Sequence, residues 1–324
     1  MTDPYVLTFE PILKEKVWGG RRLGRLGKVL PRGVDVGESW EIADLASTSS
    51  GGGGGGAARS IIANGPLAGN SLHDAMTLWG EGLLGGAQPS GAGGFPLLVK
   101  FLDAREHLSV QVHPSPAYAC AHPEAHLKTE CWYVVDAEPG SVIYKGVKPG
   151  VTREDVAGAL RTGQGEGVVE LLAAVPAVVG ECHNLPSGTV HALGAGVLVA
   201  EVQTPSDTTF RVYDWAKEYG RAGRELHVEQ ALACIDFGPA AAATVSKGSG
   251  VTRLVSTPFY AVDEIGSGAK YDTGPLGCCV VACVKDGARV GGLTLSLGGI
   301  ALVPASVSVA VTTSGCAVVF SLGA

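Results

Sequence analysis

The sequence is poor in charged residues, and fewer of these are positive than negative. Only 17% of the 324 residues are charged, and 24 Lys and Arg against 31 Asp and Glu leave a formal net charge of -7. A nucleic-acid-binding surface needs a basic stripe, so the composition argues against that class of partner. Hydrophobic residues nevertheless make up 46% of the chain. That content predicts a folded protein with a large buried core.

Targeting segments and cysteine pairs are also missing. No basic stretch followed by an apolar run opens the chain, so we expect neither a secretory signal nor a membrane partner. The most apolar region, 292–320, is interrupted by Gly, Ser, Thr and Pro304, which suits buried strands better than a membrane helix. The eight cysteines include no Cys-x-x-Cys pair, which makes a cysteine-only zinc site improbable. We expect free thiols in the cytoplasm, with Cys278 and Cys279 in the core.

Glycine, in contrast, is abundant, with 48 residues at places that resemble turns between short strands. Short strands separated by glycine-rich turns predict a mostly β protein. Helices are expected from the capping-box pattern at Ser71, at 152–160, at 168–175 and at 228–234, and the His/Pro/Ala-rich stretch 114–129 is expected to be a loop. The main strands are expected at 38–43, 95–102, 108–113, 130–135, 197–202 and 208–215.

Two stretches of small residues suggest how the chain is divided. The tract 47–58 contains six consecutive glycines and is predicted to be a flexible surface loop. The Ala/Gly/Ser-rich stretch 239–250 reads as a linker. After it come only short apolar strands without any histidine. We therefore predict a domain at 1–237 that carries the chemistry and a structural β domain at 238–324.

Four side chains in the first part form a candidate metal site. In a strand at 108–113, Gln111 and His113 point to the same face. Glu130 opens the next strand, and His191 follows a Pro-Ser-Gly turn. Histidine nitrogen with carboxylate oxygen suits zinc, while the amide oxygen of Gln111 keeps manganese, iron and cobalt open.

Three cations accompany these residues. Lys100 lies inside an apolar strand, where it is either a solvated edge residue or an ammonium that faces the site. Lys128 lies two residues before Glu130 and would share its face in an extended strand. Arg211 lies in mid-strand and requires either an ion pair with Asp207 or Asp214, or an anionic ligand.

With these residues placed, the sequence resembles the type I mannose-6-phosphate isomerases, most closely their short bacterial form. The motifs that match are FPLLVKFLDA, LSVQVHP, KTECWYVVD, LPSGTVHALG, SDTTFRVYDW, KEKVWGG and GESWEIA, all within about residues 5–237. The resemblance implies a cupin-type β-barrel or jelly roll with helical insertions at about 66–95 and 150–176, plus a smaller cupin-like β domain. It also implies interconversion of mannose 6-phosphate and fructose 6-phosphate. One departure is the glycine tract, which stands where relatives usually carry a His-Pro-Asn-Gly turn.

The resemblance assigns roles to the candidate residues. It implies one zinc ion per chain, bound by Gln111, His113, Glu130 and His191, and its Pro-Ser-Gly-x-x-His pattern selects His191 over the nearby His183. The three cations, Lys100, Lys128 and Arg211, become active-site residues, with Arg211 near the reacting end or the phosphate.

The chemistry expected of such a site is aldose–ketose isomerisation through a cis-enediol(ate). It needs a group that moves a proton between C1 and C2, and Lys100 or Lys128 could do so if its pKa were depressed. Two other functions stay open: a metal-dependent cupin oxygenase, and a non-catalytic cupin that binds sugar phosphates. A monomer and a homodimer are both compatible with the sequence.

Overall fold

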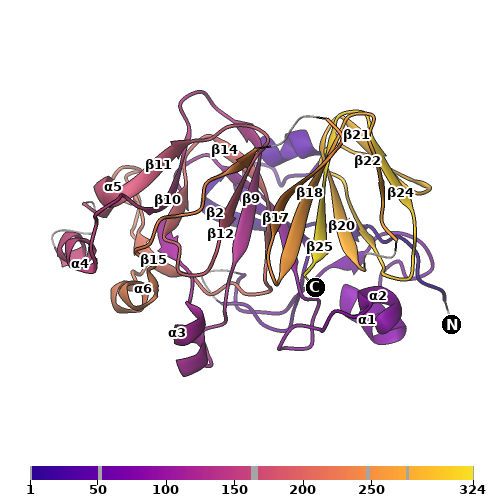
Figure 1. Ribbon diagram of the computed structural model, residues 1–324, viewed down its shortest axis with the longest axis horizontal. Helices are drawn as coiled ribbons and strands as arrows, with labels where there is room; N and C mark the ends of the chain where they lie inside the picture. Colours follow the sequence, from indigo (N-terminus) through magenta and orange to yellow (C-terminus); the bar gives the residue numbers. More distant parts are fainter. Residues whose placement is uncertain (1, 50–52, 162–166, 246–248, 275–276, 324) are drawn as a thin grey trace.

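The computed structural model describes residues 2–49, 53–161, 167–245, 249–274 and 277–323. Its fold is mostly β, and two β-sandwiches lie next to each other, one built from the first part of the chain and the other from its last part (Figure 1). The predicted fold class is therefore confirmed. None of the helices among the described residues combines the length and the apolarity that crossing a bilayer would need.

The first sandwich consists of a seven-stranded and a five-stranded antiparallel sheet. In spatial order, the seven strands are β16 (Thr244–Val245), β12 (Glu181–Leu185), β9 (Glu130–Ala137), β14 (Val197–Gln203), β7 (Leu98–Ala104), β2 (Ile12–Gly20) and β3 (Val36–Ile42). The five strands are β11 (Leu172–Pro176), β10 (Val142–Val147), β13 (His191–Leu193), β8 (Val110–Val112) and β15 (Phe210–Tyr213). Two short pairs flank them: β1 (Phe9–Glu10) with β6 (Ile61–Ile62), and β4 (Asp44–Leu45) with β5 (Ala58–Arg59).

The second sandwich is smaller and contains the strands predicted beyond the linker. One sheet has the order β17 (Val251–Ser256), β18 (Tyr260–Gly266), β25 (Cys316–Leu322), β20 (Cys279–Lys285) and β23 (Ile300–Val303). The other has the order β19 (Lys270–Asp272), β24 (Ala310–Thr313), β21 (Gly287–Val290) and β22 (Leu293–Ser296). Cys278 and Cys279 are buried, as predicted.

The two faces of the seven-stranded sheet belong to different cores, because successive side chains of a strand point to opposite sides. The outer face, with Phe101 and Tyr133, packs in one large cluster with Val262 and Phe320 of the second sandwich. The inner face lines the interior of the first sandwich. This interior core consists of aromatic and aliphatic side chains from several strands, among them Trp132. Residues from both sides of position 237 thus share a core, and the division into two domains there remains a prediction.

Several helices lie where the sequence predicted them. Helix α1 (Leu72–Trp79) has the predicted capping box: Ser71 Oγ accepts from the Asp74 N–H at 3.2 Å, and the Ser71 N–H donates to Asp74 at 2.9 Å. Further helical segments include η1 (Arg22–Leu26), α2 (Glu81–Leu84), α4 (Arg153–Arg161) and α6 (Val228–Cys234). Side chains of α4 and α6 share a core with the outer face of the five-stranded sheet.

Two local predictions were wrong. The helix expected at 168–175 ends early, because α5 (Val168–Leu171) is followed by strand β11, which pairs with β10 and completes a sheet edge. Sheet pairing, which is a tertiary interaction, overrides local helix propensity here. The loop expected at 114–129 contains α3 (Pro116–Ala121), which starts with proline and is capped by Ser115 Oγ, the acceptor for the Tyr118 N–H at 3.2 Å.

Parts of the predicted loops lie outside the described residues, namely 50–52 of the glycine tract, 162–166 of the second helical insertion and 246–248 of the linker. The described end of the glycine tract is hydrogen-bonded. Gly53 N–H donates to Asp207 at 3.1 Å, and Lys14 Nζ donates to the Gly53 carbonyl at 2.6 Å. Strand β2, which carries Lys14, thus holds this part of the loop.

Candidate metal centre and active site

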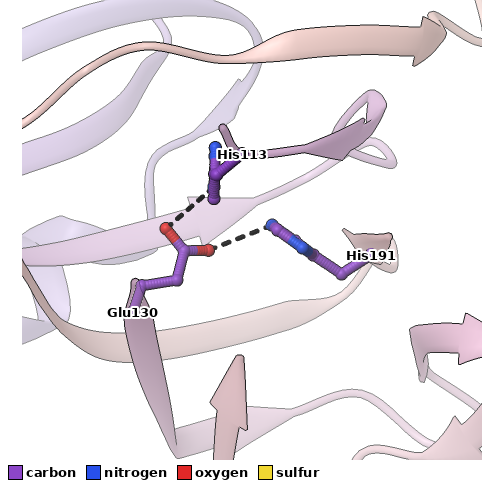
Figure 2. Close-up of side chains that lie close together, drawn as sticks. All are labelled: His113, Glu130 and His191. Carbon is purple, nitrogen blue, oxygen red and sulfur yellow. Dashed lines mark ion pairs between the residues drawn. The ribbon is translucent and has the colours of Figure 1, made fainter. Parts of the chain in front are cut away.

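Two histidines and a glutamate from three strands converge inside the first sandwich (Figure 2). His113 follows β8, Glu130 begins β9 and His191 begins β13. Their possible ligand atoms all lie within 4.8 Å of one another. His113 Nε2 is 3.2 Å from Glu130 Oε2, and His191 Nε2 is 3.1 Å from Glu130 Oε1. All three side chains are buried.

Backbone carbonyl groups fix the orientation of both imidazole rings. His113 Nδ1 lies 3.0 Å from the Thr208 carbonyl oxygen, and His191 Nδ1 lies 2.8 Å from that of Thr189. Each Nδ1–H is therefore the donor, and each Nε2 presents a lone pair to the Glu130 carboxylate. His113 Nε2 and Glu130 Oε1 have no hydrogen-bond donor among the described residues, while Glu130 Oε2 pairs with the Lys128 ammonium at 2.8 Å. Buried acceptors that face one another without a proton are costly, and a metal cation would satisfy them.

The electrostatic environment keeps these groups in their metal-binding forms. Burial and the nearby Lys128 ammonium lower the pKa of His113 to about 3. Burial alone would raise the pKa of Glu130, but Lys128 and His113 hold it well below its usual value. A metal requires neutral imidazole and ionised carboxylate, so the donor set fits a divalent cation.

Gln111 borders the cluster without completing it in this structure. Its amide nitrogen is 3.3 Å from His191 Nε2, and its amide oxygen, the atom that would bind a metal, accepts weakly from Ser109 Oγ at 3.4 Å. Rotating the amide by 180° would exchange the two atoms. Gln111 therefore remains a predicted fourth ligand.

A glycine shapes the turn that presents His191. Gly188 has φ of 88°, and a Cβ there would lie 3.0 Å from the Cys234 carbonyl oxygen. The Gly188 N–H also donates to the His113 carbonyl at 3.3 Å. The Pro-Ser-Gly turn thus connects the two histidine-bearing segments.

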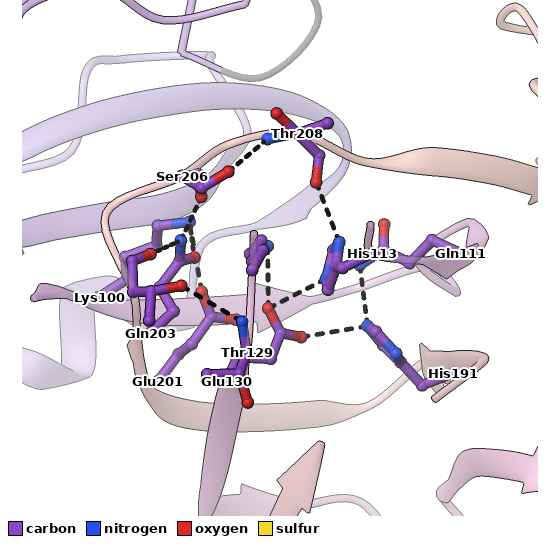
Figure 3. A network of polar contacts seen from close by, with 12 residues as sticks. Lys100, Gln111, His113, Thr129, Glu130, His191, Glu201, Gln203, Ser206 and Thr208 are labelled. Atoms are coloured by element: carbon purple, nitrogen blue, oxygen red, sulfur yellow. Dashed lines mark hydrogen bonds and ion pairs between the residues drawn. The ribbon is translucent and has the colours of Figure 1, made fainter. Parts of the chain in front are cut away.

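Lys100 is buried in a central strand, so the alternative of a solvated edge position was wrong. Its Nζ donates to Gln203 Oε1 at 2.8 Å and lies 3.2 Å from Glu201 Oε1 (Figure 3). The same Nζ lies 3.7 Å from Glu38 Oε2. The ammonium also lies 4.9 Å from the centre of the Trp40 ring. Burial would lower the pKa of Lys100, but Glu201 and Glu38 raise it overall. The side chain is therefore a cation held next to the triad.

Sequence reasoning assigned no role to Glu201 and Gln203. Both are buried on β14, and Glu201 is the direct strand partner of Lys100. Trp132 Nε1 donates to Glu201 Oε2 at 2.7 Å. Burial raises the pKa of Glu201, with Lys100 opposing the shift. The sequence did contain a signal for this pair: Glu201 is an acid within the apolar strand 197–202, and a buried Lys100 needs a negative partner.

Lys128 contacts the triad directly. Its Nζ is 2.8 Å from Glu130 Oε2, and the side chain is buried. The strand itself begins only at Glu130. The two side chains are therefore in contact, although the extended strand that was expected to place them on one face does not reach Lys128.

Arg211 lies on β15 opposite Gln111 of β8, so it borders the cluster. Its Nη1 donates to the Glu225 carbonyl at 2.7 Å, and its Nε is 3.9 Å from Asp214 Oδ1. Asp207 is instead the acceptor for the Ser49 N–H at 2.6 Å and for Gly53, so it is not positioned as the partner of Arg211. Of the two ion pairs considered from the sequence, the structure contains the one with Asp214 at long range.

His183 lies apart from the triad, on β12. It is buried, and its Nε2 is 3.4 Å from Glu181 Oε2. Trp18 is buried in the interior core of the first sandwich, also apart from the triad.

Comparisons with known proteins give the family of the chain. The family model of the phosphomannose isomerase type I catalytic domain matches residues 6–143. The mannose-6-phosphate isomerase of Streptococcus mutans is 37% identical over 269 residues, which cover 81% of this chain and 78% of that protein. The chain belongs to the type I phosphomannose isomerase family.

Further relatives of this family extend the similarity to both sandwiches. Mannose-6-phosphate isomerase ManA of Bacillus subtilis is 37% identical over 72% of this chain and 69% of its own length. The crystal structure of the mannose 6-phosphate isomerase from Bacillus subtilis superposes with a TM-score of 0.80 at 28% identity, covering 97% of this chain and 98% of that one. The resemblance seen in the sequence is thus confirmed.

Proposed function

We propose that this phosphomannose isomerase family member interconverts D-mannose 6-phosphate and D-fructose 6-phosphate. The observation that carries the proposal is the set of buried acceptor atoms of His113, Glu130 and His191, next to the ammonium groups of Lys100 and Lys128. A site that forms an enediolate needs acceptor atoms that bind a metal cation, and it needs donor groups that bind the sugar oxygens. The names of the relatives supply mannose 6-phosphate, and the family resemblance of the sequence supplies fructose 6-phosphate as the other sugar.

The metal in this proposal is one zinc ion per chain. His113, Glu130 and His191 would hold it, with Gln111 as the fourth protein ligand, and manganese, iron and cobalt are the alternatives. When bound, a divalent cation polarises the oxygens at C1 and C2 of the sugar. A structure of a mannose 6-phosphate isomerase bound with zinc and yttrium shares the fold of this chain, at 19% identity and a TM-score of 0.76.

The two buried lysines supply the remaining chemistry. Lys100 is held in its charged form by Glu201 and Glu38, so it is positioned to stabilise negative charge on a sugar oxygen. Lys128 adjoins Glu130 and faces the same interior. A base must be neutral to take up a proton, and the depressed pKa that this role requires is not found at Lys100, whose pKa is raised. We therefore assign the proton transfer between C1 and C2 to Lys128.

Isotope exchange separates the roles of the lysines. Each is replaced by methionine, and uptake of solvent deuterium at C1 or C2 of the sugar is measured separately from net isomerisation. The lysine that moves the proton is the one whose loss abolishes uptake, which we expect of Lys128→Met. Normal uptake in Lys128→Met would contradict the assignment.

Arg211 is the proposed contact for the phosphate group. It borders Gln111, its Nη1 is tied to a carbonyl group, and its side chain is about 12% exposed, so part of the guanidinium faces solvent. A planar guanidinium binds phosphate in a bidentate manner.

A coupled assay on mannose 6-phosphate, run before and after chelation of metal, tests the proposal. Turnover that is lost on chelation and restored by zinc is the expected result. Oxygen consumption without isomerisation would identify the oxygenase alternative, and sugar-phosphate binding without turnover would identify a binding protein. The proposal includes a cytoplasmic location, supported by eight free cysteines, and a monomer or homodimer.

A further inference from the structure

Asp214 follows β15 directly and collects arginine side chains around one buried carboxylate. We propose that Asp214 is a positioning residue that sets the guanidinium of Arg211 for the substrate. This inference rests on the proposed function, in which Arg211 contacts the phosphate. It adds a residue that itself does not touch the sugar.

Asp214 is the centre of a hydrogen-bonded arginine cluster. Its Oδ2 accepts from Arg221 Nη1 at 2.8 Å and from the Arg224 backbone N–H at 2.9 Å, and its Oδ1 accepts from Arg224 Nε at 2.7 Å. Arg221 also donates to the Asp214 carbonyl at 2.7 Å. Burial would raise the pKa of Asp214, but the bonds from Arg224 and Arg221 lower it, so the carboxylate stays ionised.

The segment that Asp214 binds through Arg221 and Arg224 continues along the chain to Glu225 and His227, which contact Arg211. Glu225, the residue after Arg224, offers the carbonyl that accepts from Arg211 Nη1 at 2.7 Å. Two residues later, His227 accepts the Arg211 backbone N–H on its Nδ1 at 3.1 Å and donates its own N–H to the Arg211 carbonyl at 2.8 Å. Arg211 is thus held at its backbone and its guanidinium by one short segment, and Asp214 anchors the start of that segment.

The turn after Asp214 is itself fixed. Trp215 has φ of 56°, a left-handed conformation that a bulky residue adopts only when its surroundings enforce it. Its indole is buried and donates from Nε1 to the Leu108 carbonyl at 2.8 Å. Leu108 lies three residues before Gln111, so this bond connects the turn to the strand segment that carries the candidate ligand.

Asp214 acts through geometry, because its own ion pairs are made with other arginines. Arg221 and Arg224 take its short hydrogen bonds, and Arg211 Nε stays at 3.9 Å. Burial and the charge of Arg224 lower the pKa of Arg211 to about 10, which leaves it protonated at neutral pH. The guanidinium of Arg211 is therefore charged and oriented without being neutralised at close range.

A double-mutant cycle tests the proposal. Asp214→Asn keeps the shape of the side chain but weakens its bonds to Arg221 and Arg224. Arg211→Lys keeps the charge but loses the planar guanidinium that the Glu225 carbonyl orients. We expect Asp214→Asn to raise KM for mannose 6-phosphate roughly 10-fold, with zinc content unchanged. In the Arg211→Lys background the same change should add less than about 2-fold, because the two residues act as a unit.

Asp263 provides the matched control. It is also a buried aspartate, and its Oδ2 accepts from Arg253 Nη2 at 3.0 Å, but it lies in the second sandwich. Asp263→Asn should lower the melting temperature without raising KM. A multiplicative effect of Asp214→Asn in the Arg211→Lys background, or a normal KM in Asp214→Asn, would overturn the proposal.

Two further measurements keep the test decisive. If Asp214→Asn does not fold, Arg224→Lys loosens the same anchor and should show the same dependence on Arg211. Calorimetric binding of mannose 6-phosphate repeats the cycle without turnover. Binding without isomerisation in the unsubstituted protein would contradict the proposed reaction, while the cycle on binding affinity would still decide the role of Asp214.

Discussion

Replacing Glu130 by Gln gives the sharpest test of the metal centre. The substitution keeps the size of the side chain and removes its charge. Glu130 is fully buried and lies 2.8 Å from Lys128 and 3.2 and 3.1 Å from the two histidines. Without metal, the loss leaves Lys128 without its carboxylate, and breaking a buried pair costs about 3 kcal/mol of unfolding free energy.

Glu130→Gln should also lose the part of the unfolding free energy that bound metal contributes. A site occupied at 100 times its Kd adds about 2.7 kcal/mol to the free energy of unfolding. For a chain of this size that corresponds to a rise in Tm of roughly 5 °C. Thermal unfolding with chelator and with zinc should show this rise in the unsubstituted protein and none in Glu130→Gln.

A second buried glutamate serves as the control for this experiment. Glu264 lies in the second sandwich and accepts from Tyr133 OH at 2.6 Å, so Glu264→Gln also removes a buried carboxylate. It should keep the full zinc-induced rise in Tm. An equal rise in Glu130→Gln would refute the metal centre described above.

Two further predictions concern stability. Glu38 is buried, yet Lys16 and Lys100 outweigh the effect of burial and lower its pKa from 4.5 to about 2. Because the pKa is lower in the folded state, the carboxylate stabilises the fold above pH 4.5, and this stabilisation is lost as the pH falls through 2. Chemical unfolding should show Glu38→Gln less stable than the unsubstituted protein by about 3 kcal/mol at pH 7, and a gap that does not narrow by pH 3 would contradict this account. Gly188→Ala should cost about 2 kcal/mol and weaken zinc binding, because φ is 88° and the new Cβ meets a carbonyl oxygen. Gly140→Ala, with φ of 84° and open space, should cost less and leave zinc binding unchanged.

Local signals in the sequence were enough for the main elements. Alternation placed Gln111 and His113 on one face, and the capping pattern at Ser71 placed the start of α1. The family motifs singled out His113, Glu130 and His191, which the structure brings together. The roles assigned to these residues remain predictions, because proximity does not establish what a side chain binds.

Two of the failures have a common physical cause, whereas the missed helix α3 had local signals in Ser115 and Pro116. The stretch after Leu171 became a strand because β10 offered a pairing partner, and that pairing depends on the fold. The counter-charges of Lys100 were missed for the same reason, since Glu201 is a hundred residues away and becomes its neighbour only through the register of β14 and β7.

The sequence by itself determined the fold class, the family and the candidate residues for the chemistry, because each of these follows from short motifs and from local periodicity. Only the tertiary structure decided which buried charges face each other. Sheet register brings Glu201 to Lys100, and the segment that ends at His227 holds Arg211 and is bound through Arg224 to Asp214. Interactions between distant segments set these contacts, and no local pattern encodes them.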